Sequence, residues 1–292
     1  MAEAGRVGSP RLVRPVVICR IVETSNQTAA DPRNMPYDLA DTTAVVTGAG
    51  RGNGRETAKL LADDGASVVV NDIEGEVAET VAETIRDGGG EAVGVEADVS
   101  DEVTVEAMFD AAAEEFGTVD VLVNNAGIGQ GDRFMNKPDG SDFRRNLEIH
   151  LFGAIHCTRA ALDGMVEQGY GKIVNLTSIH TKNGVGMSPQ YDVAKFSLLG
   201  LTKSLALELG REGIRVNAVA PGWVNTRMTE GFDPETREQI TSQNPLGRFA
   251  EPEDIAQAIA FLCAPASDYV NGHELRVDGG QVPIDSWKHR YE

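Results

Sequence analysis

A tyrosine, a lysine and a serine in the second half of the chain have types and spacing that could do chemistry. Tyr191 and Lys195 are four residues apart, so on a helix they share one face. Ser178 lies thirteen residues before Tyr191, just after a strand expected at 172–176. A phenol, an ammonium and a hydroxyl held together can bind a substrate oxygen and move a proton. Tyr-x-x-x-Lys by itself is a weak signal, and it gains specificity only as part of an ordered set of motifs.

The first member of that set is a glycine-rich loop that directly follows the first expected strand. It reads Thr47-Gly48-Ala49-Gly50-Arg51-Gly52-Asn53-Gly54, and a helical pattern comes next. Glycines here allow positive φ, let the backbone approach a pyrophosphate and let the helix pack close to the strand. The pyrophosphate would face free N–H groups at the positive end of the helix dipole. The order of strand, loop and helix therefore predicts a dinucleotide site rather than a simple turn.

The second member is an acidic residue at the end of the second strand, and it favours NAD as the cofactor. Asp72 lies about 20 positions after the glycines, where a carboxylate accepts hydrogen bonds from the ribose 2′-OH of NAD. The same carboxylate would repel the 2′-phosphate of NADP. Arg51 is the counter-argument, because a basic residue in the loop could contact that phosphate. We give Asp72 more weight, since Arg51 has a long and mobile stem, and NADP stays the alternative.

Strand and helix patterns alternate from Thr42 onwards, and they must position these residues. The alternation predicts an α/β fold: a doubly wound parallel sheet (Rossmann fold) in a single domain, with helices on both faces and right-handed crossovers. The expected strands are Ala44–Thr47, Ser67–Asn71, Ala92–Glu96, Val119–Asn124, Lys172–Leu176, Arg215–Val219 and Glu274–Val277. The expected helices are Glu56–Asp64, Val77–Asp87, Val103–Phe116, Asp142–Glu167, Gln190–Leu209 and Asp254–Leu262.

One interval, residues 223–248, lacks a clear pattern. It lies beyond a strand end, where such folds bind ligands, so we expect a partly helical lid. Residues 180–190, this lid and the tail at 281–292 should line the substrate pocket. Their apolar side chains and few fixed charges suggest a mainly apolar or neutral polyol substrate, although ordinary lid packing would explain the same residues.

Together these features resemble the short-chain dehydrogenase/reductase family over roughly residues 38–280. The ordered set is highly specific for the family and almost silent about the substrate. The resemblance implies an oxidoreductase that moves a hydride between a nicotinamide cofactor and an alcohol or ketone. The matching motifs are Thr47–Gly54, Asp98-Val99, Asn124-Asn125-Ala126-Gly127, Ser178, Tyr191 with Lys195, and Pro221-Gly222 with Thr226.

The resemblance also implies catalytic roles, which elementary chemistry supports. Tyr191 would be the general acid/base, although a free tyrosine with a pKa of about 10 is a poor base at neutral pH. The ammonium of Lys195 and the positive charge of the nicotinamide would favour the phenolate. Ser178 would hold and orient the substrate oxygen, and Lys195 would also bind the nicotinamide ribose.

By the same resemblance, further positions contact the cofactor. Asp98 and Val99 would flank the adenine, and Asn125 would shape the central contact. Thr226 and the backbone after Pro221 would bind the carboxamide. The expected cofactor-binding residues are Gly48, Arg51, Gly52, Asn53, Gly54, Asp72, Asp98, Val99, Asn125, Tyr191, Lys195, Pro221, Val224 and Thr226.

The long central helix departs from the family at one position. The family usually has an asparagine there, which holds a water that links the lysine to solvent, whereas this chain has His150. A neutral imidazole offers a donor and an acceptor and could hold the same water, so His150 is a candidate catalytic residue. The alternative is a buried histidine that fills space while the relay is rerouted. Asn53 also departs from the family, which usually has a small apolar residue there.

The composition excludes several classes of function. A formal net charge of −19 lacks the basic stripe that nucleic acid binding requires. No apolar run approaches the ~20 residues of a membrane span. Cys19, Cys157 and Cys263 are far apart, and neither they nor the five histidines show disulfide or metal-ligand spacing, so we expect no metal and a reducing, cytoplasmic location. The excess of carboxylates fits an ordinary acidic cytosolic enzyme or an acidic proteome adapted to concentrated salt.

The catalytic domain is expected to span residues 35–280, followed by a C-terminal tail at 281–292. Residues 1–34 carry a small net positive charge, unlike the acidic remainder, and show no periodic apolar face. We expect a disordered extension, or a misread start with Met35 as the true first residue. The helices expected at 142–167 and 190–209 carry more apolar residues than one buried face needs, which predicts a homotetramer or homodimer.

Three functions remain in competition. The first is an NAD(H)-dependent dehydrogenase that interconverts a secondary alcohol and a ketone, with Tyr191 as the acid/base. The second is an NADPH-dependent 3-oxoacyl-thioester reductase acting on an acyl carrier protein, which the acidic segment Glu251–Asp254 disfavours because the carrier is itself acidic. The third, from another class, is a nucleotide-binding subunit without turnover. The intact Ser178, Tyr191 and Lys195 argue against this third function.

Overall fold

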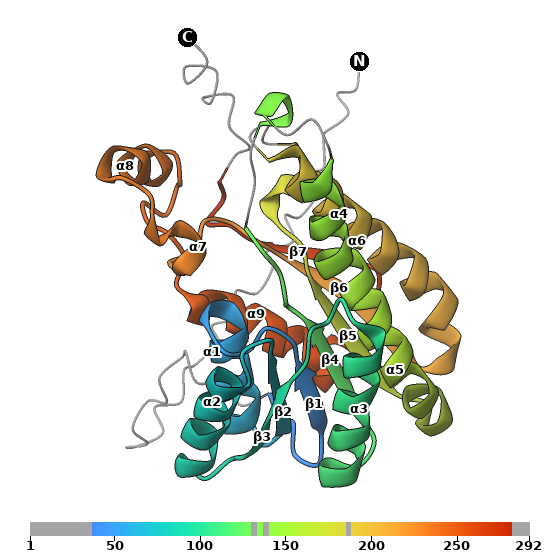
Figure 1. The fold of residues 1–292 in the computed structure, drawn as a ribbon. Coiled ribbons are helices and arrows are strands. Elements are labelled where there is room, and N and C mark those ends of the chain that lie inside the picture. Colours follow the sequence, from blue (N-terminus) through green and yellow to red (C-terminus); the bar gives the residue numbers. More distant parts are fainter. Residues whose placement is uncertain (1–36, 130–132, 137–139, 185–187, 282–292) are drawn as a thin grey trace, which may run out of the picture. The chain divides into compact units, whose positions relative to one another are not determined.

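The computed structural model describes residues 37–129, 133–136, 140–184 and 188–281, and all of them belong to one compact unit, Pro36–Glu292. The expected extension at 1–34 and all but the first residue of the expected tail at 281–292 lie outside the described residues. Figure 1 shows a central sheet with helices packed on both sides. The expected α/β, doubly wound architecture is confirmed.

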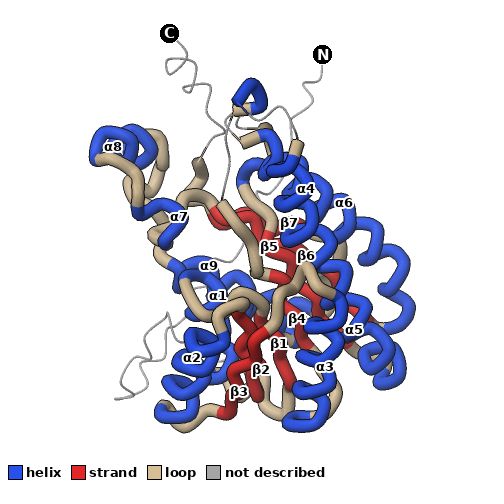
Figure 2. The backbone as a smooth tube through the Cα atoms, in the orientation of Figure 1, coloured by secondary structure: helices blue, strands red, loops and turns tan. Residues whose placement is uncertain are grey.

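Within the described residues, seven strands form one sheet in the order β3-β2-β1-β4-β5-β6-β7, and every pairing is parallel (Figure 2). Each expected strand is present, although several bounds differ by one or two residues. The strands are β1 Thr43–Val46, β2 Ser67–Asp72, β3 Glu91–Glu96, β4 Val121–Asn124, β5 Gly171–Leu176, β6 Ile214–Pro221 and β7 Glu274–Val277.

Two hydrophobic cores explain why the central strands are runs of apolar residues rather than alternating patterns. In β1, Ala44 and Val46 belong to one core, whereas Val45 belongs to the other. A parallel sheet buried on both faces requires apolar residues at both parities. Helices α1 Gly52–Asp63, α2 Gly75–Asp87 and α9 Pro252–Cys263 cover the first face, and α3 Glu102–Phe116, α5 Gly153–Gln168 and α6 Pro189–Leu209 cover the second (Figure 1).

The expected single helix at 142–167 is interrupted. Helix α4 spans Ser141–Leu147, a π-helical turn follows at Glu148–Phe152, and α5 begins at Gly153. The backbone N–H of Gly153 donates to the carbonyl of Glu148, one residue further than in an α-helix. Such π-turns insert one extra residue and are frequent at functional sites. This one carries His150.

The lid expected at 223–248 is partly helical, as predicted. It contains α7 Arg227–Glu230 and α8 Pro234–Ser242, and Figure 1 shows α8 standing away from the sheet. Asp233 caps α8 by accepting a hydrogen bond from the backbone of Thr236 at 2.7 Å. In the part of the chain that the structure describes, no helix has the length and apolar character needed to cross a membrane.

The sheet has a topological switch point where β1 lies between β2 and β4. Helical connections leave β1 and β4 towards opposite faces, so a crevice opens beyond their carboxyl ends. The glycine-rich loop follows β1, and Asn125 follows β4. The fold thus brings the expected cofactor motifs to one edge of the sheet.

Candidate active site

The glycine-rich loop needs its glycines for both conformation and space. Gly48 and Gly52 have φ values of +60° and +53°, which side chains rarely adopt. A Cβ at Gly50 would lie 2.6 Å from Oδ2 of Asp72, and one at Gly54 would lie 2.4 Å from Nδ2 of Asn125. Any side chain at Gly50 or Gly54 would therefore separate the loop from the ends of β2 and β4.

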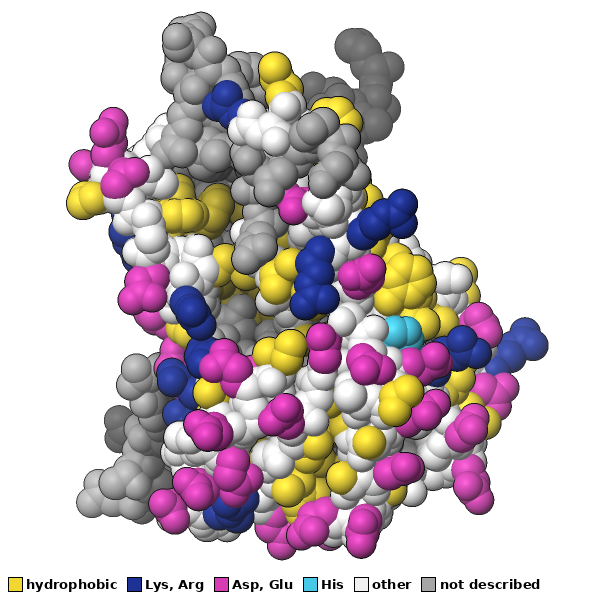
Figure 3. Space-filling model, viewed as in Figure 1, with side chains coloured by type: hydrophobic (Ala, Val, Ile, Leu, Met, Phe, Trp, Pro, Cys, Tyr) yellow, Lys and Arg dark blue, Asp and Glu magenta, His cyan; other side chains and the backbone are white. Residues whose placement is uncertain are grey.

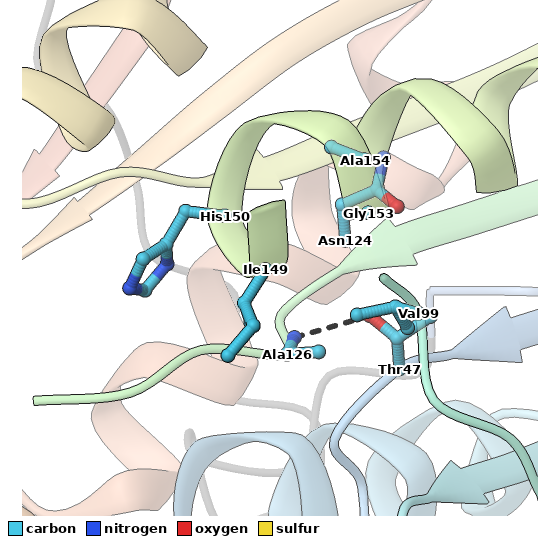
Figure 4. Close-up of a pocket in the computed structure, with 8 residues that line it drawn as sticks. All are labelled: Thr47, Val99, Asn124, Ala126, Ile149, His150, Gly153 and Ala154. Carbon is cyan, nitrogen blue, oxygen red and sulfur yellow. Dashed lines mark hydrogen bonds between the residues drawn. The ribbon is translucent and has the colours of Figure 1, made fainter. Parts of the chain in front are cut away.

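The end of β4 fastens this loop through Asn125 and Thr47. The amide of Asn125 donates to the carbonyls of Thr47 and Gly48 at 2.8 and 2.9 Å. In return, Oγ1 of Thr47 accepts from the backbone N–H groups of Asn125 and Ala126, and Figure 4 shows the bond to Ala126. Asn125 thus shapes the loop, and Thr47, at the start of the expected motif but absent from the expected contacts, is its partner.

The N-terminus of α1 is open for an anion. Among the described residues, no side chain caps this helix, whose N-cap position is Arg51. Free N–H groups at such an end bind phosphate together with the helix dipole. Thr226 lies directly against the loop, since its Cγ2 would be 3.3 Å from a Cβ at Gly52. The segment that follows Pro221, the last residue of β6, therefore reaches the glycine loop, and its Val224 is buried.

The charged groups beside the expected ribose position form a small network. Asp72 is buried, and its carboxylate accepts from the backbone N–H groups of Gly50 and Glu74 at 3.1 Å each. Arg51 forms a two-pronged pair with Glu74 at 2.8 and 2.9 Å. The hydrogen bonds from Arg51 lower the pKa of Glu74. The pair also engages the guanidinium that a 2′-phosphate would need. Sequence reasoning missed Glu74, which lies two residues after Asp72.

Asp98 and Val99 lie after β3, where the family motif places them. Asp98 accepts from the backbone and the hydroxyl of Ser100 at 2.9 and 2.6 Å, so it fixes a turn. Val99 is buried against Gly153, the first residue of α5. A Cβ at Gly153 would lie 2.7 Å from the Val99 side chain. The turn and α5 are therefore packed together at the expected adenine position.

The three expected catalytic residues converge beyond β5 and at the start of α6. Ser178 and Lys195 are buried, and Tyr191 is half-buried. The Lys195 ammonium nitrogen lies 5.5 Å from the centre of the Tyr191 ring. Because β1, β4 and β5 are parallel neighbours, this cluster and the glycine loop lie at the same sheet edge.

Burial has the largest effect on the pKa values of Tyr191 and Lys195. Desolvation raises the pKa of Tyr191 to about 12, while a hydrogen bond with Ser178 pulls it down. Desolvation likewise lowers the pKa of Lys195 to about 7, and its Nζ donates to the carbonyl of Leu176 at 2.6 Å. In the protein without cofactor the raised pKa keeps Tyr191 protonated near neutral pH, and the expected joint effect of Lys195 and the nicotinamide charge stays a prediction for the cofactor complex.

His150 points towards Tyr191. Its ring centre lies 5.4 Å from that of Tyr191, and Figure 4 shows the imidazole directed away from Thr47 and Val99. Nε2 is bound to the backbone of Ile128, at 3.0 Å from the carbonyl oxygen. Desolvation, with a further contribution from Lys195, holds the pKa of His150 well below its usual range, so the ring is neutral.

The second nitrogen of His150 is left for another partner. Nδ1 is buried and makes no hydrogen bond within the described residues, and the same is true of Oδ1 of Asn124. Both residues line a cavity of about 10 Å³, roughly the space of one water molecule (Figure 4). A buried water is stabilised by hydrogen bonds to two to four polar groups.

A histidine-aspartate pair beside Tyr191 escaped the sequence reasoning. Nδ1 of His180 lies 2.6 Å from Oδ1 of Asp192, and both side chains are mostly buried. The pair could have been suspected from its neighbours in the sequence, because His180 is two residues after Ser178 and Asp192 directly follows Tyr191. No cluster with three or more metal-ligating side chains occurs among the residues that the structure describes.

The loop that carries Ser178 is also braced from β7. One carboxylate oxygen of Glu274 accepts from the hydroxyls of Thr177 and Thr181, both at 2.7 Å. The Thr181 hydroxyl oxygen also lies 2.6 Å from the carbonyl oxygen of Ser178, so its single proton is shared between the two acceptors. These bonds fix the backbone on both sides of Ser178, and nothing in the local sequence pattern predicts a bond from so distant a strand.

This arrangement has many counterparts among known proteins. A family model described as enoyl-(acyl carrier protein) reductase matches residues 48–281. Cis-4-hydroxycyclohexanecarboxylate dehydrogenase of Sinomonas cyclohexanicum is 44% identical over 246 residues, which cover 84% of this chain and 98% of that protein. A 3-oxoacyl-[acyl-carrier-protein] reductase of Staphylococcus aureus is 39% identical over 238 residues, covering 81% of this chain and 96% of that one.

The likeness extends to three dimensions. A solved structure of 7α-hydroxysteroid dehydrogenase, complexed with NADH and 7-oxo glycochenodeoxycholic acid, superposes with a TM-score of 0.82 at 36% identity and covers 85% of this chain and 97% of that one. The motifs, their convergence at one sheet edge and these full-length similarities agree. The chain belongs to the short-chain dehydrogenase/reductase family of oxidoreductases.

Proposed function

We propose that this protein transfers a hydride between NAD(H) and a secondary alcohol or ketone, with Tyr191 as the general acid/base. The observation that carries the proposal is the convergence of Ser178, Tyr191 and Lys195 beside a glycine loop at one sheet edge. A non-catalytic nucleotide-binding subunit would have no need for three buried polar groups in this arrangement, because burying them carries a cost.

The residues present fit a dinucleotide. The loop is a cradle that a Cβ at Gly50 or Gly54 would fill, and the N-terminus of α1 offers free N–H groups. The nicotinamide ring would supply the hydride acceptor or donor, and in its oxidised form a positive charge near Tyr191. Lys195 would turn from the Leu176 carbonyl to the ribose, and Thr226 would face the carboxamide from its place against Gly52.

The proton step belongs to Tyr191. With a pKa raised to about 12, it is a phenol in the protein alone, so it is ready to give a proton to a ketone oxygen. In the oxidative direction it takes the proton of the alcohol, which requires added positive charge nearby to lower its pKa. Ser178, fixed between Thr177 and Thr181, holds the substrate oxygen in reach of the phenol.

His150 is proposed to replace the family asparagine in a proton relay. Its Nδ1 is buried without a hydrogen-bond partner among the described residues, and its ring lies against that of Tyr191. A water held there would connect the buried Lys195 to other polar groups. The neutral state that burial enforces keeps one ring nitrogen as an acceptor.

NAD rather than NADP is proposed as the cofactor. The buried carboxylate of Asp72 lies at the expected ribose position, and it would repel a 2′-phosphate. The argument for NADP rested on Arg51, and the pair with Glu74 weakens it because the guanidinium is already engaged. Binding a phosphate there would first require this pair to break.

The rival activity, reduction of a 3-oxoacyl thioester on a carrier protein, is disfavoured by charge. Figure 3 shows Asp and Glu side chains spread over the α2 and α3 side, with few Lys or Arg among them. The N-terminus of α9 adds Glu251, Glu253 and Asp254. An acidic carrier protein would be repelled from such a surface. The similarity to the Staphylococcus reductase keeps this rival in the test.

Initial rates of nicotinamide reduction or oxidation decide between these functions. We expect turnover of cyclic secondary alcohols, such as cis-4-hydroxycyclohexanecarboxylate or a hydroxysteroid, with NAD. Acetoacetyl thioester with NADPH is the competing assay. A higher kcat/KM in that assay would favour the rival, and no turnover with any alcohol, ketone or thioester would favour the binding subunit.

A further inference from the structure

The His180–Asp192 pair lies in the wall of the active site. The His180 ring centre is 5.2 Å from that of Tyr191 and 6.4 Å from that of Trp223, and Trp223 in turn is 5.4 Å from Phe232 in the lid. These rings form a continuous aromatic surface from the catalytic phenol to the segment after α7. Within this surface His180 brings a ring nitrogen that can bind a polar group.

The two nitrogens of His180 have different tasks. Nδ1 is engaged by Asp192 at 2.6 Å, and the backbone N–H of His180 donates to Oγ of Ser178 at 3.3 Å, so both ring and backbone are fixed relative to the catalytic residues. Nε2 makes no hydrogen bond to the described residues, and it is not sealed from solvent as His150 Nδ1 is. A carboxylate that holds one ring nitrogen orients the imidazole and leaves the other nitrogen to a ligand.

We propose that His180, held by Asp192, binds a carboxylate group of the substrate. This inference rests on the proposed function, because it assigns one end of the alcohol or ketone that Tyr191 converts. The reacting carbon would lie at Ser178 and Tyr191, and the carboxylate would lie at Nε2, on the far side of the His180 ring from Asp192. The substrate would therefore carry its acid group several bonds away from its carbinol, as on a single ring.

Charge favours a carboxylate over an apolar group at this position. An imidazolium between Asp192 and the substrate would donate one N–H to each carboxylate, and each of these bonds is charge-assisted. The 2.6 Å separation from Asp192 is already as short as such bonds. An apolar substituent would displace water from Nε2 without replacing its hydrogen bond.

The test compares two ligands of the same shape that differ in charge. Cyclohexanecarboxylate and cyclohexanecarboxamide are titrated against the enzyme with NADH bound, and dissociation constants are measured by thermal shift or calorimetry. We expect the wild type to bind the acid at least about tenfold more tightly than the amide, since a hydrogen bond to a charged group contributes about 1.5 kcal/mol or more.

The variants locate that preference. His180→Phe keeps a ring against Tyr191 and Trp223 but removes the nitrogens, and Asp192→Asn keeps the shape of the carboxylate but removes its charge. We expect both to lower the preference for the acid to about threefold or less. Lys182→Met is the matched control, because it removes an exposed cation two residues along the same segment and should leave the preference intact.

Kinetics with cis-4-hydroxycyclohexanecarboxylate and its carboxamide separate binding from chemistry. Loss of the His180 contact should raise KM for the acid more than for the amide, whereas a general packing defect would change both alike. The inference is overturned if the wild type binds acid and amide equally, if His180→Phe retains the preference, or if Lys182→Met abolishes it. Turnover of both alcohols without any charge preference would overturn it while leaving the proposed function intact.

Discussion

The nucleotide end and the catalytic end of the site lie at the same sheet edge, but they use charge differently. Around the glycine loop the paired charges are exposed, with side chains of Arg51 and Glu74 that are 41% and 53% accessible. Around Tyr191 the ionisable groups are buried, and their pKa values move far from the usual range. The first region presents mainly backbone groups, and in the second region desolvation shifts the pKa values of the side chains.

This difference predicts unequal sensitivity to substitution. A solvent-exposed ion pair contributes little, because water and salt screen it. A buried ionisable group affects both proton transfer and stability, because its environment has few other charges. Substitutions at the catalytic end should therefore have large effects, and those among the exposed charges should mainly change cofactor preference.

The largest effect is expected at the phenol. Tyr191→Phe removes the proton donor while keeping the ring beside His150 and His180. We expect kcat to fall by about 10³-fold, within the range for general acid/base groups, with little change in the dissociation constant for NADH. Stopped-flow or steady-state rates together with cofactor fluorescence titration measure both. A loss of less than tenfold would remove Tyr191 from its proposed role.

Lys195→Met should abolish most activity and yet stabilise the fold in a pH-dependent way. Burial lowers the pKa of Lys195 to about 7, whereas an unfolded lysine titrates near 10.4. Between these pH values the unfolded chain binds the extra proton, so wild-type stability rises with pH. The variant lacks this cost.

The measurement for Lys195→Met is urea unfolding at about pH 7 and about pH 9.5. The stability of the variant relative to wild type should be greatest at the lower pH and shrink by at least about 1 kcal/mol at the higher pH. The unpaired carbonyl of Leu176 subtracts a similar amount at both pH values, so it does not affect the difference. A gain that does not depend on pH would contradict the lowered pKa.

His150 should show an intermediate effect. If it holds a relay water, His150→Ala should lower turnover about 10- to 100-fold, whereas His150→Asn should keep most of it. Because the pKa of His150 in the folded state is well below normal, the free energy of unfolding of the wild type falls as pH drops below about 6.5. Both variants should lose this part of the pH dependence. Unchanged turnover per folded enzyme in His150→Ala would leave only a packing role.

Cofactor preference should respond to the exposed pair by a smaller factor. We expect wild type to bind NAD at least about tenfold more tightly than NADP. Glu74→Gln frees Arg51 without touching the bond from Asp72 to Gly50, so it should raise NADP affinity about three- to tenfold. Asp72→Ala should narrow the gap further. A wild-type preference for NADP would refute our interpretation of Asp72.

The oligomeric state should respond least to the substitutions in the active site. Apolar side chains on the turn before α5 and on α6 are solvent-exposed in the single chain, including Phe152 at 48%, Phe196 at 43% and Leu207 at 87%. Such residues suit a symmetric helix interface, and we expect a homodimer or homotetramer. Light scattering at micromolar concentration should show it in the wild type and in Tyr191→Phe alike. A monomer at high salt would contradict the expectation.

Local sequence determined the conformation of the glycine loop and the place of Asp72 at the end of β2. Glycine conformations, the strand-loop-helix order and the acidic strand end are properties of a short segment, so the loop and Asp72 were found where predicted. The strands were equally easy to predict, because burial on both faces gives apolar runs in the sequence that differ from the helical patterns. The helix expected at 142–167 was the exception, since the π-turn at Glu148–Phe152 leaves no distinct pattern in the local sequence.

At the catalytic end the sequence determined which groups are present, and the tertiary structure decided their state. Spacing placed Tyr191 and Lys195 on one helix face, but only the surrounding core could set the desolvation that shifts the pKa values of both groups. Contacts such as Glu74 with Arg51, Asp192 with His180 and Glu274 with Thr181 join residues from different elements. The physical reason is that pKa values and hydrogen bonds depend on neighbours in space, which local sequence patterns do not specify.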